Sequence, residues 1–211
     1  MKIALLGAES TGKTSLAHDI AARLRGRGQR VAVVDEALRG WCRREGRLPG
    51  PQEHAVIARA QELAVDESAA KVDIVIADTS ALVVALYGGL RFAGEPTWEF
   101  AKAQQRRYDL TLLTGLDLPW VADGLQREGP PQRDAFDAML REALREAGVD
   151  WRMVYGKGEE RTLNALEAVA EAAPWAWTAR PQPAVRWVGV CDACSDPECE
   201  HRLFRGLVNN T

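Results

Sequence analysis

The sequence predicts an α/β fold in three layers, with a five-stranded parallel sheet between helices and a short tail at the end. Apolar, β-branched runs alternate with helical patterns from residue 2 to about residue 173. Strands that alternate with helices pair in parallel through right-handed crossovers. Of the 211 residues, 46% are hydrophobic and 27% are charged, and this composition supports a packed core. Because the composition changes after Pro174, we expect one domain at residues 1–173 and a tail at residues 174–211.

Each expected element has its own pattern of apolar residues. Short apolar runs predict strands at residues 2–6, 30–35, 72–78, 109–113 and 149–155. Apolar residues at helical spacing predict helices at residues 13–25, 52–70, 81–90, 98–107 and 161–173. A further helix is expected between Asp134, as its N-cap, and Gly148. Its inward face is Phe136, Met139, Leu140, Ala143 and Leu144. The segment from Gly115 to Pro131 before it predicts a long functional loop.

Residues 7–14 carry the strongest motif in the chain. They read Gly-Ala-Glu-Ser-Thr-Gly-Lys-Thr and match G-x-x-x-x-G-K-[ST], with an expected strand before them and an expected helix after them. In such a loop, successive backbone N–H groups point into one concavity at a helix N-terminus, which suits a polyphosphate. This motif predicts a P-loop NTPase fold that binds ATP. The expected nucleotide-binding residues are Gly7, Glu9, Ser10, Thr11, Gly12, Lys13, Thr14 and Ser15.

A magnesium ion is expected beside the phosphates. The Thr14 hydroxyl is one expected ligand. Asp78 follows the apolar run of the third strand, so it is placed to hold Mg²⁺ directly or through water. The alternative is that Asp78 only caps the helix that follows.

The chain lacks the motifs of two other classes of P-loop protein. Residues 114–117, Thr-Gly-Leu-Asp, are the nearest match to the guanine-binding motif Asn-Lys-x-Asp, and they have neither the Asn nor the Lys. The Leu-Ser-Gly-Gly-Gln stretch that is typical of transporter ATPases is absent from the sequence. A GTPase and a transporter ATPase are therefore disfavoured.

A small-molecule kinase needs an acid near the acceptor hydroxyl and cations over the γ-phosphate. Glu36, at the end of the second strand, is the expected acid, with Asp35 as the alternative. Arg127 and Arg133 flank Gly129-Pro130-Pro131, where a hinged loop can carry them onto the phosphates. The alternative for both arginines is solvent-exposed loop charge. The expected catalytic residues are therefore Lys13, Glu36, Asp35, Asp78, Arg127 and Arg133.

Two segments resemble the ribosylnicotinamide kinase domain of NadR-type proteins. Residues 7–16 are similar to that family's phosphate loop, and residues 119–125, Pro-Trp-Val-Ala-Asp-Gly-Leu, are similar to a more distinctive segment. The Glu36-x-x-Arg39 spacing adds to a similarity that covers roughly residues 1–170. The resemblance implies a P-loop nucleoside-kinase fold that uses Mg·ATP to phosphorylate the 5′-hydroxyl of nicotinamide riboside.

The expected substrate-binding residues lie on several elements. Trp41 offers a stacking face and Gln61 an amide edge, although core packing of Trp41 and a surface or core-bridging role of Gln61 are open alternatives. The resemblance adds residues of the distinctive segment. The full expected set is Arg39, Trp41, Gln61, Trp120 and Asp123.

The chain also departs from the family pattern. Asp35 and Ala37, rather than aromatic residues, flank Glu36, and Ser80 stands where the family has an Asp. These departures keep a second interpretation open, in which the chain is an ATP-binding or ATP-hydrolysing regulatory module for a protein partner and has no nucleoside kinase activity.

The tail contains a cluster of metal-binding residue types. Cys-x₂-Cys followed by Cys-x-His is typical of a structural Zn²⁺ site, although the second pair is closely spaced. The alternative is a set of reduced thiols or a redox pair. The expected zinc ligands are Cys191, Cys194, Cys199 and His201.

Charge and hydropathy indicate the partners that we expect. With a net charge of −3, the chain lacks the basic excess that nucleic-acid binding requires. Its sequence contains no run of roughly 18 apolar residues, the length a membrane helix needs, and no signal peptide. We therefore expect a cytoplasmic protein that binds a nucleotide and a small nucleoside, without nucleic acid or membrane as a partner.

Overall fold

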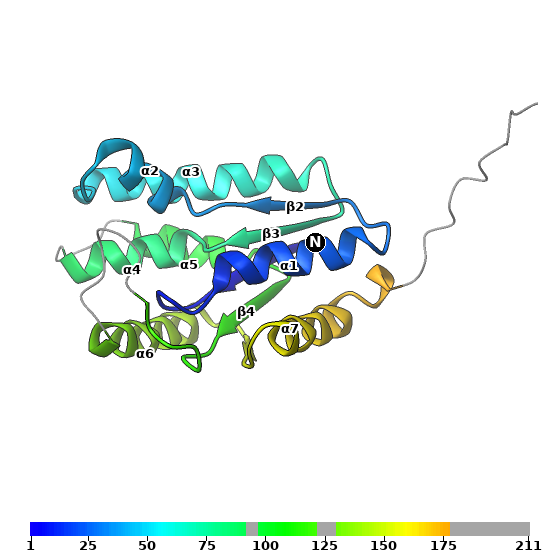
Figure 1. Ribbon diagram of the computed structural model, residues 1–211. Helices are drawn as coiled ribbons and strands as arrows, with labels where there is room; N and C mark the ends of the chain where they lie inside the picture. Colours follow the sequence, from blue (N-terminus) through cyan, green and yellow to red (C-terminus); the bar gives the residue numbers. More distant parts are fainter. Residues whose placement is uncertain (92–96, 122–129, 178–211) are drawn as a thin grey trace, which may run out of the picture. The chain divides into compact units, whose positions relative to one another are not determined.

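Five parallel strands form one sheet in the computed structural model, which describes residues 1–91, 97–121 and 130–177. The strand order is β2-β3-β1-β4-β5, so β1 lies at the centre. The sheet and its helices are drawn in Figure 1. The strands are β1 (Lys2–Leu6), β2 (Val31–Val34), β3 (Ile74–Asp78), β4 (Leu110–Thr114) and β5 (Arg152–Val154). This arrangement confirms the predicted five-stranded parallel sheet.

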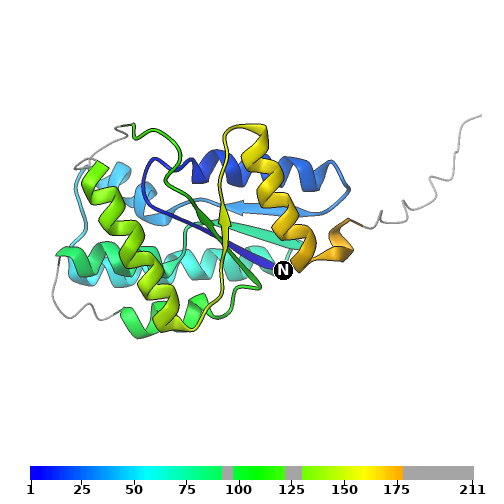
Figure 2. The same cartoon turned by 90° about the horizontal axis from the view of Figure 1, so that it is seen from below.

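Helices cover both faces of the sheet (Figure 2). One face packs against α1 and α7, and the other packs against helices α2 to α6. The helices are α1 (Lys13–Arg25), α2 (Ala37–Glu45), α3 (Pro51–Ala69), α4 (Ala81–Arg91), α5 (Trp98–Gln105), α6 (Pro130–Ala147) and α7 (Glu159–Ala172). A one-turn 3₁₀ helix, η1 (Pro174–Ala176), follows α7.

The central strand β1 shows why the strands have apolar side chains on both faces. Successive side chains of a strand point to opposite faces of the sheet. Ile3 and Leu5 pack in the cluster with α1 and α7, whereas Ala4 and Leu6 pack in the cluster with α2 to α6. Because both faces of a parallel sheet are covered, its strands are continuous apolar runs.

The structure corrects some of the predicted boundaries. Helix α6 begins at Pro130, so Asp134 lies inside the helix and is not its N-cap. Proline is favoured in the first turn because its φ is already helical and its missing N–H would have no partner there. Helix α2, for which the sequence predicts no boundaries, covers Ala37–Glu45. The predicted inward face of α6 is confirmed, because Phe136, Leu140, Ala143 and Leu144 are buried and Met139 is partly buried.

The chain divides into two units, Met1–Thr178 and Ala179–Thr211. The second unit lies outside the described residues. Residues 174–177, which the sequence places in the tail, belong to the first unit: Ala176 is buried, and its carbonyl accepts a hydrogen bond from Gln29 Nε2 at 3.1 Å. The predicted domain division otherwise remains a prediction.

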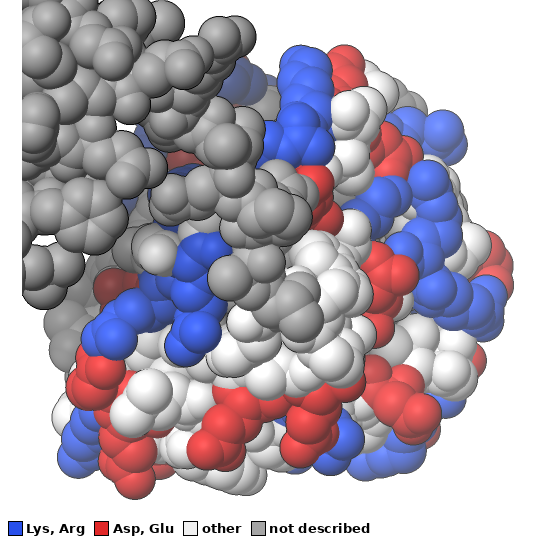
Figure 3. All heavy atoms as spheres, turned by 90° about the vertical axis from the view of Figure 1, so that its right-hand side faces the viewer, with Lys and Arg blue, Asp and Glu red and all other residues white. Residues whose placement is uncertain are grey.

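The amino ends of the strands lie opposite the end that carries the motif residues. There Arg30 pairs with Asp73, with 2.9 Å between Nη2 and Oδ1. Acidic and basic side chains are interspersed over the described part of the face at this end (Figure 3). Within the described part of the chain, no helix has the length and apolar character needed to cross a membrane.

Candidate nucleotide and phosphoryl-acceptor site

Residues 7–12 form the loop between β1 and α1, and its shape depends on Gly7. Gly7 has φ +149°, and a Cβ added there would lie 2.0 Å from Thr114 Oγ1 on β4. Lys13 begins α1 and is buried. Its Nζ donates to the Ala8 carbonyl at 2.7 Å, and Thr11 Oγ1 donates to the same carbonyl at 2.7 Å. The loop is thus held by its own side chains around one carbonyl, with the lysine folded against it.

Thr14 and Asp78 form the oxygen pair expected to hold Mg²⁺. The carboxyl end of β3 lies beside β1, with Asp78 opposite Leu5 in the parallel register. Thr14 Oγ1 donates to Asp78 Oδ2 at 2.5 Å, and Asp78 Oδ1 is buried without a hydrogen-bond partner among the described residues. A buried carboxylate oxygen beside a hydroxyl suits Mg²⁺, which binds through one or two protein oxygens together with phosphates and waters. These residues therefore fit the ion.

A chain of contacts connects this pair to the end of β2. Arg39, on α2, donates from Nη1 to Thr14 Oγ1 at 3.1 Å, and its Nη2 lies 2.9 Å from Glu36 Oε2. Glu36, Arg39, Thr14 and Asp78 are therefore brought together. Asp35 is placed elsewhere: its side chain is 82% exposed, and its Oδ1 lies 4.0 Å from His18 Nε2. Of the two expected acids, only Glu36 lies in this chain of contacts.

Gln61 and Trp41 have partners on neighbouring elements. Gln61, on α3, is fully buried, and its Oε1 accepts from the Ala37 N–H at the start of α2 at 2.7 Å. Gln61 is thus a bridge between two helices, while its Nε2 is buried without a partner among the described residues. Trp41 packs partly buried against the core, and the guanidinium carbon of Arg47 lies 4.7 Å from its ring centre.

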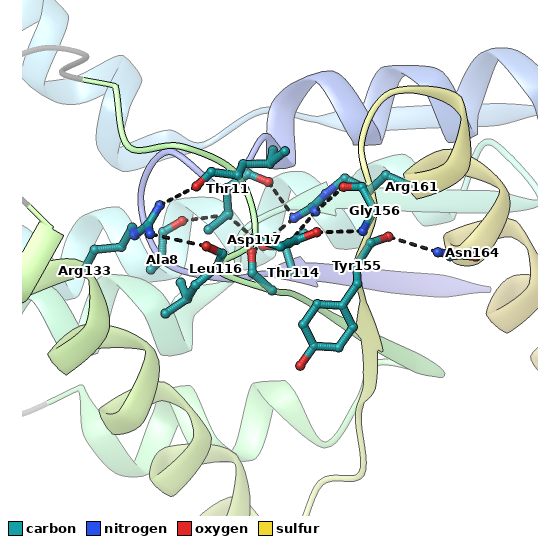
Figure 4. A network of polar contacts seen from close by, with 12 residues as sticks. Ala8, Thr11, Thr114, Leu116, Asp117, Arg133, Tyr155, Gly156, Arg161 and Asn164 are labelled. Atoms are coloured by element: carbon teal, nitrogen blue, oxygen red, sulfur yellow. Dashed lines mark hydrogen bonds and ion pairs between the residues drawn. The ribbon is translucent and has the colours of Figure 1, made fainter.

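The segment after β4 lies against the phosphate loop. Ser10 Oγ donates to the Val121 carbonyl at 2.6 Å, and Trp120 Nε1 donates to Glu9 Oε1 at 3.3 Å. Arg133, 9% exposed on α6, donates to the carbonyls of Leu118 and Leu116 at 2.8 and 3.3 Å. In this structure Arg133 anchors the loop after β4 (Figure 4), and the phosphate-covering role expected of it stays a prediction. Arg127 and Asp123, and the tail residues Cys191, Cys194, Cys199 and His201, lie outside the described residues.

The residues after Asp78 combine backbone strain with buried polar contacts. Thr79 has φ +81°, a conformation that costs a non-glycine residue about 1–3 kcal/mol. Ser80 is fully buried; its hydroxyl donates to Gln105 Oε1 at 2.6 Å and accepts from the Leu82 N–H at 3.2 Å. Ser80 therefore holds the first turn of α4, and strain persists beside Asp78 because the neighbouring residues are fixed.

A buried carboxylate supports the same turn from α3. Glu62 Oε1 accepts from the Ala81 N–H at 2.8 Å, and the Tyr108 hydroxyl donates to Glu62 Oε2 at 3.1 Å. Burial raises the pKa of Glu62, and these two hydrogen bonds oppose the rise without cancelling it. Burial and the neighbouring Glu62 charge raise the pKa of Tyr108 well above its usual value. The start of α4 is thus held by the carboxyl group of Glu62, whose charged form is disfavoured by burial.

Arg161 and Asp117 are site-supporting residues for which the sequence predicts no role. Arg161, on the first turn of α7, is 3% exposed, and its Nη1 lies 2.8 Å from Asp117 Oδ1 (Figure 4). Burial raises the pKa of Asp117, but hydrogen bonds from Arg161 and the Gly156 N–H outweigh it and lower the pKa below its usual value. In the sequence, Asp117 is visible only as the last residue of the incomplete match to a guanine-binding motif. Its pairing with Arg161 is not visible there, because the two residues are 44 positions apart.

The chain matches a protein family and is similar to solved structures, among them two NadR proteins. The family described as AAA domain matches residues 2–161. A NadR protein solved in complex with NAD and AMP-PNP aligns with a TM-score of 0.65 at 22% identity, over 82% of this chain and 49% of that chain. A NadR protein solved in complex with NR aligns with a TM-score of 0.68 at 21% identity, over 81% of this chain and 50% of that chain.

These similarities confirm the predicted P-loop fold and the predicted resemblance to NadR proteins. The two alignments cover 49% and 50% of the NadR chains, so this chain spans about half of their length. Among curated proteins, none matches the chain.

Proposed function

Because the chain belongs to the AAA domain family, we propose that it binds Mg·ATP at residues 7–14 and transfers the γ-phosphoryl group to a small nucleoside. The observation that carries this proposal is the chain of contacts from Asp78 through Thr14 and Arg39 to Glu36. It extends the nucleotide site toward a carboxylate on a different strand end. A protein that only binds ATP has no need of such a carboxylate, whereas phosphoryl transfer to a hydroxyl uses one.

In the proposed reaction, the acceptor oxygen forms a bond to the γ-phosphorus while the bond to the bridging oxygen of ADP breaks. Glu36 orients the acceptor hydroxyl and takes its proton. Lys13 stabilises negative charge on the transferred group, and the loop amides hold the remaining phosphates in line. Thr14 and Asp78 would hold Mg²⁺, which would supply charge neutralisation at the phosphate oxygens. Asp35 is the second candidate for the acid.

We propose nicotinamide riboside as the acceptor. Support comes from the resemblance of residues 119–125 to the distinctive segment of NadR-type kinases. The contact of Trp120 with Glu9 supports this proposal, because it joins the described start of that segment to the phosphate loop. Arg39 and Trp41 lie on α2, directly after Glu36.

The second candidate is an ATP-binding regulatory module. Ser80 favours it, because this position has a buried hydroxyl bonded to Gln105 where the resembling family has a carboxylate. Such a module would hydrolyse ATP slowly and would be indifferent to nucleosides. The cytoplasmic location and the zinc-binding tail remain predictions from the sequence.

One experiment separates the two candidates. The chain is incubated with Mg·ATP, with and without nicotinamide riboside, and products are measured by mass spectrometry. We expect nicotinamide mononucleotide and ADP in equal amounts, and little ADP without the nucleoside. Acceptor-independent ADP formation without a phosphorylated nucleoside would contradict the kinase and support the module. A thermal-shift screen of other nucleosides with Mg·ATP then tests the choice of acceptor, because a ligand that binds only the folded state raises the melting temperature.

A further inference from the structure

The guanidinium group of Arg161 joins three loops at the carboxyl end of the sheet (Figure 4). Its Nη2 donates to the carbonyl of Thr11 in the phosphate loop at 2.9 Å and to that of Gly115 after β4 at 3.2 Å. Its Nη1 donates to Asp117 Oδ1 at 2.8 Å and to the carbonyl of Gly156 after β5 at 2.9 Å. A side chain with five donors in a rigid plane is suited to fix several acceptors at once.

We propose that Arg161 is a positioning residue for nucleotide binding: it holds the Thr11 carbonyl so that the next amide of the phosphate loop faces the phosphates. The inference rests on the proposed binding of ATP at residues 7–14, and it does not depend on the identity of the acceptor.

Peptide geometry connects the Arg161 contact to the ligand. In a planar trans peptide, the C=O of one residue and the N–H of the next point in opposite directions. Because Arg161 binds the Thr11 carbonyl from the α7 side, the Gly12 N–H points away from α7. Backbone N–H groups of a glycine-rich loop before a helix are the donors that bind phosphates. Arg161 therefore fixes the direction of one phosphate-binding donor without touching the ligand.

Asp117 keeps this arrangement in place. It pairs with Arg161 Nη1 and accepts from the Gly156 N–H through Oδ2 at 2.7 Å. A buried guanidinium needs a charged partner because an uncompensated buried charge is strongly destabilising. The pairing also orients the guanidinium plane, since Nη1 is held by Asp117 while Nη2 is directed to Thr11. Thr114 also holds the loop, because its hydroxyl donates to Thr11 Oγ1 at 2.7 Å.

The test compares nucleotide binding in the full chain with Arg161→Met and Arg161→Lys. The probes are Mg·ATP and adenosine, whose affinities are measured by calorimetry and ligand-observed NMR. We expect Arg161→Met to weaken ATP binding by about tenfold to a hundredfold, the effect of losing one charge-assisted hydrogen bond, and to leave adenosine binding unchanged. Arg161→Lys keeps a donor for one carbonyl and restores part of the affinity.

A matched control removes an exposed arginine outside the proposed site. Arg152, on β5, pairs with Glu171 at 2.8 Å with both side chains largely exposed, so Arg152→Met makes the same chemical change outside the site. Its ATP affinity is expected to equal that of the unchanged chain. Should Arg161→Met fail to fold, Arg161→Lys provides the same comparison. The spectroscopic readout is the change in the Gly12 amide chemical shift when Mg·ADP is added to ¹⁵N-glycine-labelled protein. A Gly12 shift smaller than in the unchanged chain supports the proposal.

Three results would overturn the inference: equal losses for ATP and adenosine, unchanged ATP affinity in a folded variant, or an unchanged Gly12 response. If the unchanged chain binds ATP but phosphorylates no nucleoside, the proposed kinase function fails, and the ratio of ATP to adenosine affinities still decides the role of Arg161. If the unchanged chain does not bind ATP, both are wrong.

Discussion

Gly7 shows how strongly a single residue constrains the phosphate loop. The site is built at distances where one methyl group matters, since the loop lies directly against β4 through Thr114. Lys13 shows the opposite kind of constraint, because the role proposed for it depends on charge rather than on space. At this scale a substitution acts either on the shape of the loop or on its electrostatics.

Replacing Gly7 with Ala is expected to abolish ATP binding and lower the melting temperature. The added Cβ would lie 2.0 Å from Thr114 Oγ1, and φ is +149°. Gly28→Ala is the matched control, because Gly28 also has positive φ, at +81°, but nothing lies within 4 Å of its Cβ. The control should cost only the backbone strain, about 1–2 kcal/mol of unfolding free energy, and keep ATP binding. Equal effects of both changes would show that the contact with Thr114 is unimportant.

Lys13→Met is expected to lower kcat by about 10²–10³, since a preorganised charge in the site stabilises the transition state by that amount. The fold should persist, because the change removes one hydrogen bond to the Ala8 carbonyl, a loss of about 1 kcal/mol. Steady-state kinetics and thermal unfolding check the two parts. Lys71→Met, which removes an exposed lysine, should change neither. More than a tenth of the original kcat in Lys13→Met would contradict the assigned role.

The sequence predicts the residues whose partners are local and misses those whose partners are distant. The phosphate loop is predictable because its motif lies in eight consecutive residues, 7–14. The contact of Arg161 with Thr11 spans 150 residues, so no local pattern indicates it. The role of Gln61 is predicted only in part. The sequence leaves core bridging open as one interpretation, and the structure shows that Gln61 accepts a hydrogen bond from the Ala37 N–H.

At the scale of elements, the start of α4 is held by side chains from α3 and from the turn before it. Glu62 and Ser80 fix this turn, and Asp78 precedes it directly. Helix periods are visible in the sequence, whereas helix starts depend on such contacts. Helix α6 illustrates this, since it begins at Pro130 and not after Asp134. Although Asp134 resembles an N-cap, the helix starts earlier, at a proline whose φ is already helical.

Glu62→Gln is expected to make the protein progressively more stable than the unchanged chain as pH rises. The pKa of Glu62 is raised by burial, so the folded state prefers its protonated form. Its stabilising contribution is therefore complete below the ordinary glutamate pKa of about 4.3 and is lost as pH rises through the higher folded value. Gln keeps an acceptor for the Ala81 N–H and carries no charge, so it avoids this loss.

The difference in unfolding free energy between Glu62→Gln and the unchanged chain is measured by urea unfolding. The measurements run from about pH 4 to about pH 8, to cover the ordinary glutamate pKa and the raised one. Glu67→Gln removes an exposed charge from the same helix and should show no such trend. A difference that is independent of pH would contradict the raised pKa of Glu62.

At the scale of the whole molecule, the strand order places the site. Because β1 lies between β3 and β4, the loops after these three strands converge at the point where connections leave toward opposite sides, the usual ligand position in open α/β sheets. Strand type is predictable from apolar runs and parallel pairing from alternation with helices. The order of the strands in the sheet is not predictable from the sequence, because it depends on which crossovers pack best in three dimensions.

The tail is expected to bind one Zn²⁺ per chain. Cys191 and Cys194 form the Cys-x₂-Cys half-site, with Cys199 and His201 as the other ligands. Metal analysis of the purified chain should give about one equivalent of zinc, as a four-ligand structural site holds, and Cys191→Ser with Cys194→Ser should remove it. Cys42→Ser, which removes a thiol buried in α2, should retain it. Zinc content unaffected by the tail substitutions would disprove the site.

The contact between α7 and the phosphate loop has a consequence for how the protein matures on the ribosome. The loop is synthesised before Arg161, which holds its Thr11 carbonyl and is translated 150 residues later. A nascent chain that ends before Arg161 already contains the motif of residues 7–14, but its Thr11 carbonyl lacks the hydrogen bond from Arg161. If Arg161 positions the loop as proposed, we expect tight nucleotide binding only after α7 has packed against the sheet.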